Sequence, residues 1–280
     1  MAERRDSRGG GMLGELEKRM DPSARRWMTV RTVGSAPILE AKLPGQFRAW
    51  FTTRLGGKSE GAYSSFNLDP RSEDDPASVA HNRAVIAEAI GRELLSPMQV
   101  HGIRVAGAAE YVREEPRGPC DGLSLHPQID YGLAAALVFA DCVPIVLCGE
   151  VDMAVAHGGW RGILGGIVQQ AGRSTMGAPA TMVIGPSLGP CCFKVGAEVA
   201  ESFARRFGAD VVNGGGGGQG ESRVDLWEAA TRASAEIGIR REHVVNPRLC
   251  TACNPDLFFS YRMEGPVTGR QACVGWIADA

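Results

Sequence analysis

The chain has 280 residues, of which 44% are hydrophobic and 22% charged, a composition typical of a globular protein. Its formal net charge is −2, from 30 basic and 32 acidic residues, so it lacks the positive field that holds a nucleic acid. The longest apolar run is interrupted by Asp141 and Pro144 and falls short of the roughly 18 residues of a membrane helix. We therefore expect neither nucleic-acid nor membrane binding, and nothing in the sequence indicates an obligate protein partner.

Residues 1–28 are rich in Arg, Glu, Gly and Ser and lack apolar periodicity. They predict a disordered N-terminal extension, followed by one domain over residues 29–280. A signal peptide has an apolar stretch after its first charged residues, and this sequence has none at that place. Eight cysteines without the spacing of a small disulfide-rich domain fit a reducing compartment, so the expected location is the cytoplasm.

The rest of the chain alternates β-rich apolar runs with helical patterns. Strands are predicted at residues 48–53, 100–105, 133–139, 143–147, 153–156, 182–184 and 272–277. Helices are predicted at residues 75–91, 162–170, 197–207 and 226–237. This alternation is typical of the α/β class, here a single layered domain with a mixed β-sheet core and flanking helices. Five consecutive glycines, Gly214–Gly218, predict a flexible loop over residues 213–220.

Three residues combine metal-ligating chemistry with positions at strand ends. His101 opens one strand-like run, His157 closes another, and Cys142 lies between two runs where Pro144 interrupts strand pairing. Catalytic zinc sites use three protein ligands and leave one position open, and two imidazoles with one thiolate suit that type. Spacing alone does not distinguish such a site from packed core residues.

The other cysteines give a weaker pattern. Cys250 and Cys253 have C-x-x-C spacing, but no second pair with matching spacing accompanies them, so the pattern does not predict a metal there. A bridge between the adjacent Cys191 and Cys192 would be strained, and both are expected to be free thiols.

Five segments carry a family resemblance. They are Gln99–Gly102, Ala140–Pro144, Ala156–Gly162, Ile184–Cys192 and Phe258–Arg262. In this order they resemble the laccase-domain proteins, first called multicopper polyphenol oxidoreductases and later recognised as purine nucleoside phosphorylases. The resemblance implies a zinc ion on His101, Cys142 and His157, with copper possible at the same site. It also implies phosphorolysis of adenosine, inosine and S-methyl-5′-thioadenosine, together with adenosine deaminase activity.

The resemblance also takes in Thr52–Gly57, and further roles are expected of residues in these motifs. Asp141, next to a ligand, either transfers a proton as a catalytic acid or orients a ligand imidazole. Arg161 is expected to be catalytic and, with Arg54 and Arg262, to clamp phosphate, because a guanidinium pairs two oxygens at once. The other predicted substrate- or phosphate-binding residues are Gln99, Gly158, Gly185 and Tyr261. The glycines would offer backbone N–H groups to an anion, and the tyrosine would stack on a purine.

Two positions depart from the family pattern. The family usually has alanine where Gly158 stands, a change too small to move the ligands. It usually has arginine where Met263 stands, so one basic contact with phosphate or substrate is expected to be missing.

Alternative functions remain open on the sequence. A copper-dependent polyphenol oxidase would use the same two histidines and cysteine, although five histidines without a His-x-His pair are too few for a multicopper oxidase. A metal-independent cysteine hydrolase would use Cys142 as nucleophile and His157 as base. A non-catalytic metal- or partner-binding module is a third interpretation.

Overall fold

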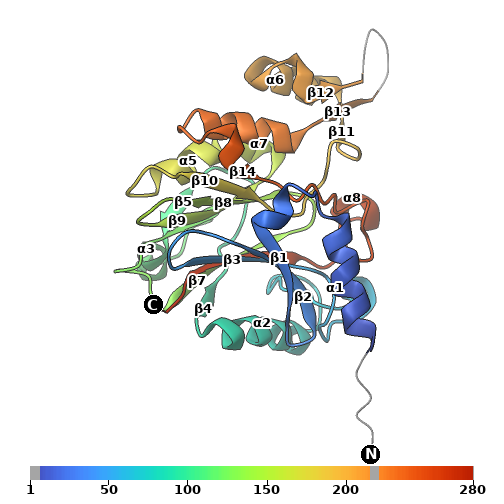
Figure 1. The fold of residues 1–280 in the computed structure, drawn as a ribbon, viewed down its shortest axis with the longest axis vertical. Coiled ribbons are helices and arrows are strands. Elements are labelled where there is room, and N and C mark those ends of the chain that lie inside the picture. Colours follow the sequence, from blue (N-terminus) through green and yellow to red (C-terminus); the bar gives the residue numbers. More distant parts are fainter. Residues whose placement is uncertain (1–6, 215–220, 280) are drawn as a thin grey trace, which may run out of the picture.

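A computed structural model describes residues 7–214 and 221–279 and contains two six-stranded sheets packed face to face (Figure 1). The first sheet has the order β1 (Met28–Val33), β2 (Ala36–Ala41), β3 (Phe47–Thr52), β15 (Gln271–Ile277), β7 (Leu133–Phe139) and β4 (Glu93–Leu95). The second has the order β14 (Val244–Val245), β10 (Thr181–Ile184), β8 (Val143–Cys148), β9 (Met153–Gly158), β6 (Gly122–Leu125) and β5 (Val105–Gly107). A small third sheet joins β11 (Lys194–Val195), β13 (Ser222–Val224) and β12 (Val212–Asn213).

Both large sheets are mixed. The pairs β4–β7, β5–β6 and β10–β14 are parallel, and the pairs inside the sheets, such as β3–β15 and β8–β9, are antiparallel. The helices are α1 (Ser7–Arg19), α2 (Pro76–Ile90), α3 (Ala108–Arg113), α4 (Trp160–Gly165), α5 (Ile167–Arg173), α6 (Ala197–Phe207), α7 (Leu226–Ala235) and α8 (Tyr261–Glu264). The predicted α/β class with a mixed β-sheet core is confirmed. In the described part of the chain, no helix has the length and apolar character needed to cross a membrane.

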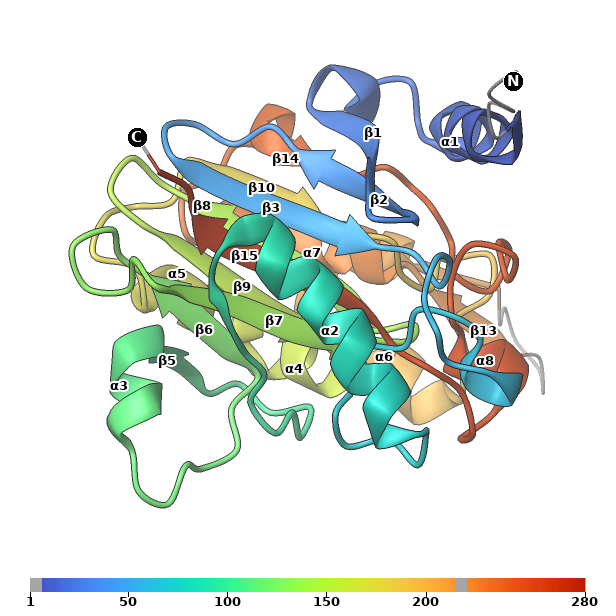
Figure 2. The same ribbon diagram turned by 90° about the horizontal axis from the view of Figure 1, so that it is seen from below.

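Side-chain alternation along the strands builds three hydrophobic layers. In β7, Leu137 and Phe139 face the core between the two sheets, whereas Ala136 and Val138 face the opposite side. That opposite side is covered by α2, which lies across the first sheet in Figure 2. The outer face of the second sheet is covered by α4, α5 and α7. The central strands of each sheet are therefore buried on both faces, which explains the nearly continuous apolar sequence of β7 to β9.

The prediction of a disordered N-terminal extension is wrong for its described part. Residues 7–19 form α1, and Leu16 and Met20 are almost completely buried in the core between the sheets. Leu16 and Met20 are four residues apart, so they lie on one face of the helix and its continuation. Arg19 also pairs with Asp256, Nη1 to Oδ1 at 2.8 Å. The predicted flexible loop at residues 213–220 falls mostly outside the described residues.

Two further element predictions need correction. Residues 100–104 are not a strand, and only Val105–Gly107 pairs, as β5. The helix predicted near residues 162–170 is divided into α4 and α5 at Gly166, whose φ of +98° lies in the left-handed region that favours glycine.

Candidate active site

The three predicted metal ligands converge at one end of the sheet sandwich. Cys142 lies in the turn where the chain leaves β7 in the first sheet and enters β8 in the second. His157 is on β9, opposite Pro144 of β8, and His101 belongs to the loop before β5. One ligand atom from each of the three lies within 4.8 Å of the others. The two imidazole centroids are 4.9 Å apart.

A buried carboxylate, Asp121, holds two of these ligands in place. Its Oδ1 accepts from the backbone N–H of His101 and contacts Nδ1 of His157, each at 2.9 Å. Its Oδ2 accepts from the backbone N–H groups of Val100 and Gly102 at 3.2 and 2.8 Å. Burial alone raises the pKa of Asp121, but the bonds from His157 and Gly102 outweigh it and lower the pKa. Because Nδ1 of His157 is bound to Asp121, Nε2 is the nitrogen left to face Cys142.

The backbone around His101 is shaped to present its side chain. His101 has a φ of +60°, a left-handed conformation that is uncommon for a residue other than glycine. The three N–H bonds to Asp121 hold this loop in place. Gly159 supplies the room, because a Cβ there would lie 2.8 Å from Cδ2 of the His101 ring. This glycine, two residues after His157, is thus a steric requirement of the site.

The ligands also change each other's protonation. Burial raises the pKa of the Cys142 thiol, but the charge of His157 and the hydrogen bond from His101 outweigh burial and bring the pKa down to about 6. Burial lowers the pKa of His157, but Cys142 and Asp121 raise it to about 9. Each residue of the pair therefore favours the charged form of the other.

These donors fit a zinc ion. One thiolate and two imidazole nitrogens are zinc ligands, three of them leave a fourth position open, and the contact between His157 and Asp121 is the usual support of a ligating histidine. Copper accepts the same donors, so the side chains do not decide the metal.

A cavity of about 540 Å³ opens in front of the three ligands. Of the predicted site residues besides the ligands, five line it: Gln99, Asp141, Arg161, Tyr261 and Arg262. Three further polar residues line the cavity although no sequence motif predicts them: Asp69 and Arg71, from the loop before α2, and Arg270, from the chain before β15. Four arginines, Arg71, Arg161, Arg262 and Arg270, are therefore among the lining residues. Trp160, Phe193 and Tyr261 give its walls aromatic surface.

Asp141 is held by three hydrogen bonds. Its Oδ1 accepts from the hydroxyls of Thr251 and Ser260 at 2.6 and 2.7 Å, and its Oδ2 accepts from the backbone N–H of Arg262 at 2.6 Å. Its φ is +90° and its side chain is buried. This carboxylate ties the Cys142 turn to the segment that carries Tyr261 and Arg262. Its hydrogen bonds reach the protein rather than a ligand imidazole.

Gln99 has a comparable anchoring contact. Its side-chain amide donates to the carbonyl of Val138 and accepts from the N–H of the same residue, both at 2.9 Å. The bonds fix the loop before His101 against the end of β7.

Three predicted binding residues lie outside the cavity. Arg54 pairs with Glu264 at 2.7 Å and donates to the carbonyls of Ser64 and Pro255. Gly158 lies within β9, opposite Val143. Gly185 donates its N–H to Pro144, and a Cβ on it would lie 2.4 Å from the ring of Phe51. Met263 is exposed and is not a lining residue.

Comparison with known proteins agrees with this arrangement. A family profile described as multi-copper polyphenol oxidoreductase laccase matches residues 48–278. The chain belongs to this family. The resemblance predicted from the five segments is confirmed, and the matched region contains the complete cavity lining.

Relatives of this chain carry enzyme names. A Bacteroides thetaiotaomicron protein named purine nucleoside phosphorylase is 32% identical over 238 residues, covering 78% of this chain and 87% of the relative. A protein named adenosine deaminase RL5, from an unknown prokaryote, is 31% identical over 237 residues, covering 79% and 90%. The solved structure of NMB0706 from Neisseria meningitidis has a TM-score of 0.77 at 28% identity and covers 90% of this chain and all of that one. This chain is an enzyme of the same family.

Proposed function

We propose that the protein is a zinc-dependent purine nucleoside phosphorylase that acts on adenosine, inosine and S-methyl-5′-thioadenosine and also deaminates adenosine. One observation carries the proposal: three metal donors and four arginines line a single cavity. The names of the relatives support the same reaction class. With its cysteines unpaired, the enzyme suits the reducing cytoplasm.

His101, Cys142 and His157 would hold the metal, and Asp121 would fix the orientation of His157. When bound, zinc in an open three-ligand site supplies Lewis acidity and activates water at neutral pH, the chemistry that deamination needs. The chain's contribution is to keep the three donors preorganised through the Asp121 hydrogen bonds.

The arginines suit the phosphate of the phosphorolysis reaction. Arg161 is exposed and its guanidinium lies 4.3 Å from the centre of the Trp160 ring, so it reaches the cavity while stacked on an aromatic wall. Arg262 donates from both terminal nitrogens to the carbonyl of Lys194, at 3.1 and 3.2 Å, which orients it. We assign phosphate binding to Arg161 first, with Arg71, Arg262 and Arg270 adding positive charge.

The aromatic side chains suit the purine. Trp160, Phe193 and Tyr261 line the cavity, and a flat heterocycle packs well against such surfaces. We assign Asp141 a positioning role, because its three hydrogen bonds with the protein already occupy both carboxylate oxygens.

The proposal is tested by incubating the zinc-loaded protein with adenosine, with and without phosphate, and separating the products. Adenine and ribose 1-phosphate that appear only with phosphate establish phosphorolysis, and inosine establishes deamination. The His101→Ala variant, folded as judged by circular dichroism, is expected to form neither. Zinc-loaded protein that forms no purine product from any of the three nucleosides would contradict the proposal.

A second candidate has its own observation. Cys142, His157 and Asp121 form a thiol, imidazole and carboxylate series, the arrangement of a cysteine hydrolase. Metal-free protein discriminates between the two. A cysteine hydrolase would turn over an activated ester through an acyl group on Cys142 and lose that activity with zinc, whereas the proposed phosphorylase gains activity with zinc.

A further inference from the structure

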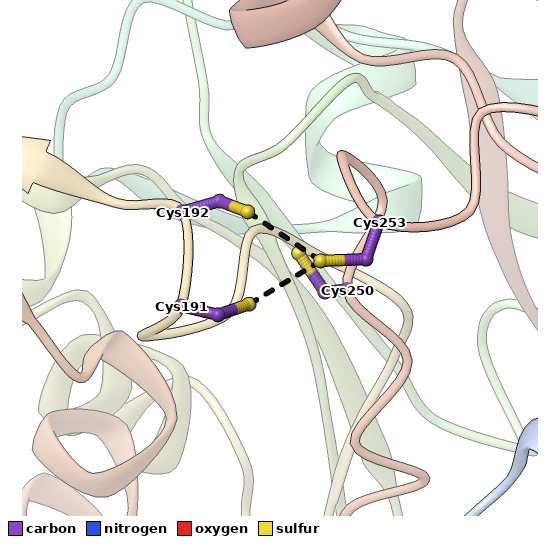
Figure 3. A group of neighbouring side chains, drawn as sticks. All are labelled: Cys191, Cys192, Cys250 and Cys253. Carbon is purple, nitrogen blue, oxygen red and sulfur yellow. Dashed lines mark hydrogen bonds between the residues drawn. The ribbon is translucent and has the colours of Figure 1, made fainter.

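A second cluster of metal-ligating side chains lies apart from the cavity ligands. It consists of Cys191, Cys192, Cys250 and Cys253, whose side chains point toward one another in Figure 3. The first two are in the loop between β10 and β11, and the other two are in the segment between β14 and α8. The C-x-x-C pair thus finds its partners on another loop, where two adjacent cysteines replace the second C-x-x-C pair of the usual pattern.

The distances fit four ligands around one ion. Sγ of Cys253 lies 3.5 Å from Sγ of both Cys191 and Cys192, and all four sulfurs lie within 4.8 Å of one another. Zinc–sulfur bonds of about 2.3 Å in a tetrahedron place neighbouring sulfurs about 3.8 Å apart. The sulfurs are also much farther apart than the roughly 2.05 Å of a disulfide bond.

The backbone around the cluster is arranged to stabilise thiolate charge. The N–H of Gly189 donates to Sγ of Cys250 at 3.3 Å, and the N–H of Cys253 is directed at the same sulfur. Such N–H donors lower the cost of burying a thiolate. Cys250 is buried, whereas Cys191 and Cys253 are exposed, so an ion has a path from solvent.

We propose that these four cysteines form a second metal site, a closed four-thiolate site that binds a structural zinc ion. The ligand set excludes the hard cations, which take oxygen donors, and four thiolates around one position are typical of zinc. An iron–sulfur cluster spreads its four thiolates over several iron atoms, whereas these sulfurs converge on one point. Binding replaces the thiol protons with the metal and involves no redox step.

The site would join two loops that shape the cavity. The loop of Cys191 and Cys192 also carries Leu188 and Phe193, which line the cavity. In the other segment, Thr251 follows Cys250 and donates to Asp141. Between the loops, the backbone N–H of Ser187 donates to Leu249 and that of Thr251 donates to Ser187. Zinc would reinforce this short pairing next to the substrate, without contacting it.

The test separates the two metal sites by variants of the full chain. Zinc per chain is measured by elemental analysis after loading and desalting. We expect two zinc ions in the unchanged protein and one in each of two double variants, His101→Ala with Cys142→Ala and Cys250→Ser with Cys253→Ser. Cys148→Ser, which changes a cysteine outside both clusters, is the control and keeps two.

X-ray absorption on the His101→Ala, Cys142→Ala variant gives a second readout, which stays decisive if the cysteine-cluster variant does not fold. Its remaining zinc is expected to have four sulfur neighbours at about 2.3 Å. The four-thiolate site would be overturned if the His101→Ala, Cys142→Ala variant bound no zinc or bound a zinc with fewer than four sulfur neighbours. A disulfide from Cys253 in protein kept under reducing conditions would also overturn it. None of these results depends on nucleoside turnover, so the proposed function fails or stands separately.

Discussion

The two cysteine-containing clusters of this protein use related ligands in opposite ways. The cavity cluster, His101, Cys142 and His157, has one sulfur and two imidazoles as donors and is supported by the Asp121 carboxylate. The loop cluster, Cys191, Cys192, Cys250 and Cys253, has four sulfurs and is supported by backbone N–H groups. A divalent ion with one thiolate keeps a net positive charge, whereas four thiolates leave a net negative charge. The first arrangement suits activation of a substrate, and the second suits mechanical connection of loops.

What stands behind the ligands reinforces this difference. Asp121 makes His157 a better donor and holds it in one orientation, so the cavity cluster is preorganised for chemistry. The N–H groups of Gly189 and Cys253 instead stabilise thiolate charge on Cys250. The number of ligands and their supporting groups, rather than the presence of cysteine, separate the candidate catalytic site from the candidate structural one.

The largest effect is expected from removal of a cavity ligand. His157→Ala should lose the metal of the cavity cluster and reduce nucleoside turnover to the background of the assay, because three donors become two. The zinc of the loop cluster should remain. Metal analysis and product chromatography on the same sample check this, and normal turnover by a variant that has lost the cavity metal would break the comparison.

Removal of the supporting carboxylate should have an intermediate effect. Asp121→Asn keeps the size of the side chain but weakens its contacts with His157 and the backbone of His101, so zinc affinity at the cavity is expected to fall about 10- to 100-fold. Competition with a zinc chelator measures it. Asp130→Asn is the matched control, since Asp130 is also buried and accepts two backbone N–H bonds, but lies outside the cavity lining. Equal affinity losses in both variants would mean that Asp121 acts only through the fold.

A smaller effect is expected from the phosphate-binding arginine. Arg161→Ala should raise the KM for phosphate roughly tenfold or more, because a charge-assisted hydrogen bond contributes about 1.5–3 kcal/mol. The deaminase reaction, which uses no phosphate, should change less. Arg31→Ala is the control, since Arg31 is an exposed arginine paired with Glu40 and is not a lining residue. An unchanged phosphate KM would remove Arg161 from the phosphate site.

The smallest change is a shift of a pH profile. In metal-free protein, alkylation of Cys142 by iodoacetamide, followed by peptide mass spectrometry, should have its midpoint near pH 6 rather than near 9, because His157 and His101 lower the pKa of the thiol. The thiolate is the reactive form, so the rate rises with pH through this pKa and then levels off. His157→Ala should move the midpoint upward. A midpoint near 9 in the unchanged protein would show that the imidazoles do not stabilise the thiolate.

The sequence predicts the interior of the fold better than its borders. The segment Leu133–Phe139 is a strand as predicted, because an apolar run of that length between polar turns is typical of a buried strand. Residues 100–104 are not a strand, because the backbone N–H groups of residues 100–102 donate to the Asp121 carboxylate and not to a neighbouring strand. Because Asp121 is 20 residues from His101, no periodic pattern in the sequence around His101 predicts this contact.

The candidate site shows the same limit. The three cavity ligands stand in motifs and were predicted, whereas Asp121, Arg71 and Arg270 reach the site only through tertiary folding. Arg54 lies in a motif but is held by Glu264 away from the cavity. The sequence does not predict the loop cluster, because Cys191 and Cys192 are adjacent and lack the intervening residues of a usual ligand pair. Local spacing identifies ligand pairs on one turn, and ligands from distant segments are predicted only where each stands in a recognisable motif, as His101, Cys142 and His157 do.

The hydrogen bonds of Asp141 limit which side chains can replace it. Asparagine could keep the three contacts only if both hydroxyls turned from donors to acceptors of its NH2 group, and glutamate would be one methylene too long for the same three donors. Alanine would leave two hydroxyls and a peptide N–H without their acceptor. Aspartate accepts all three hydrogen bonds without any change in its partners, so this one carboxylate joins the Cys142 turn to the segments of Thr251, Ser260 and Arg262.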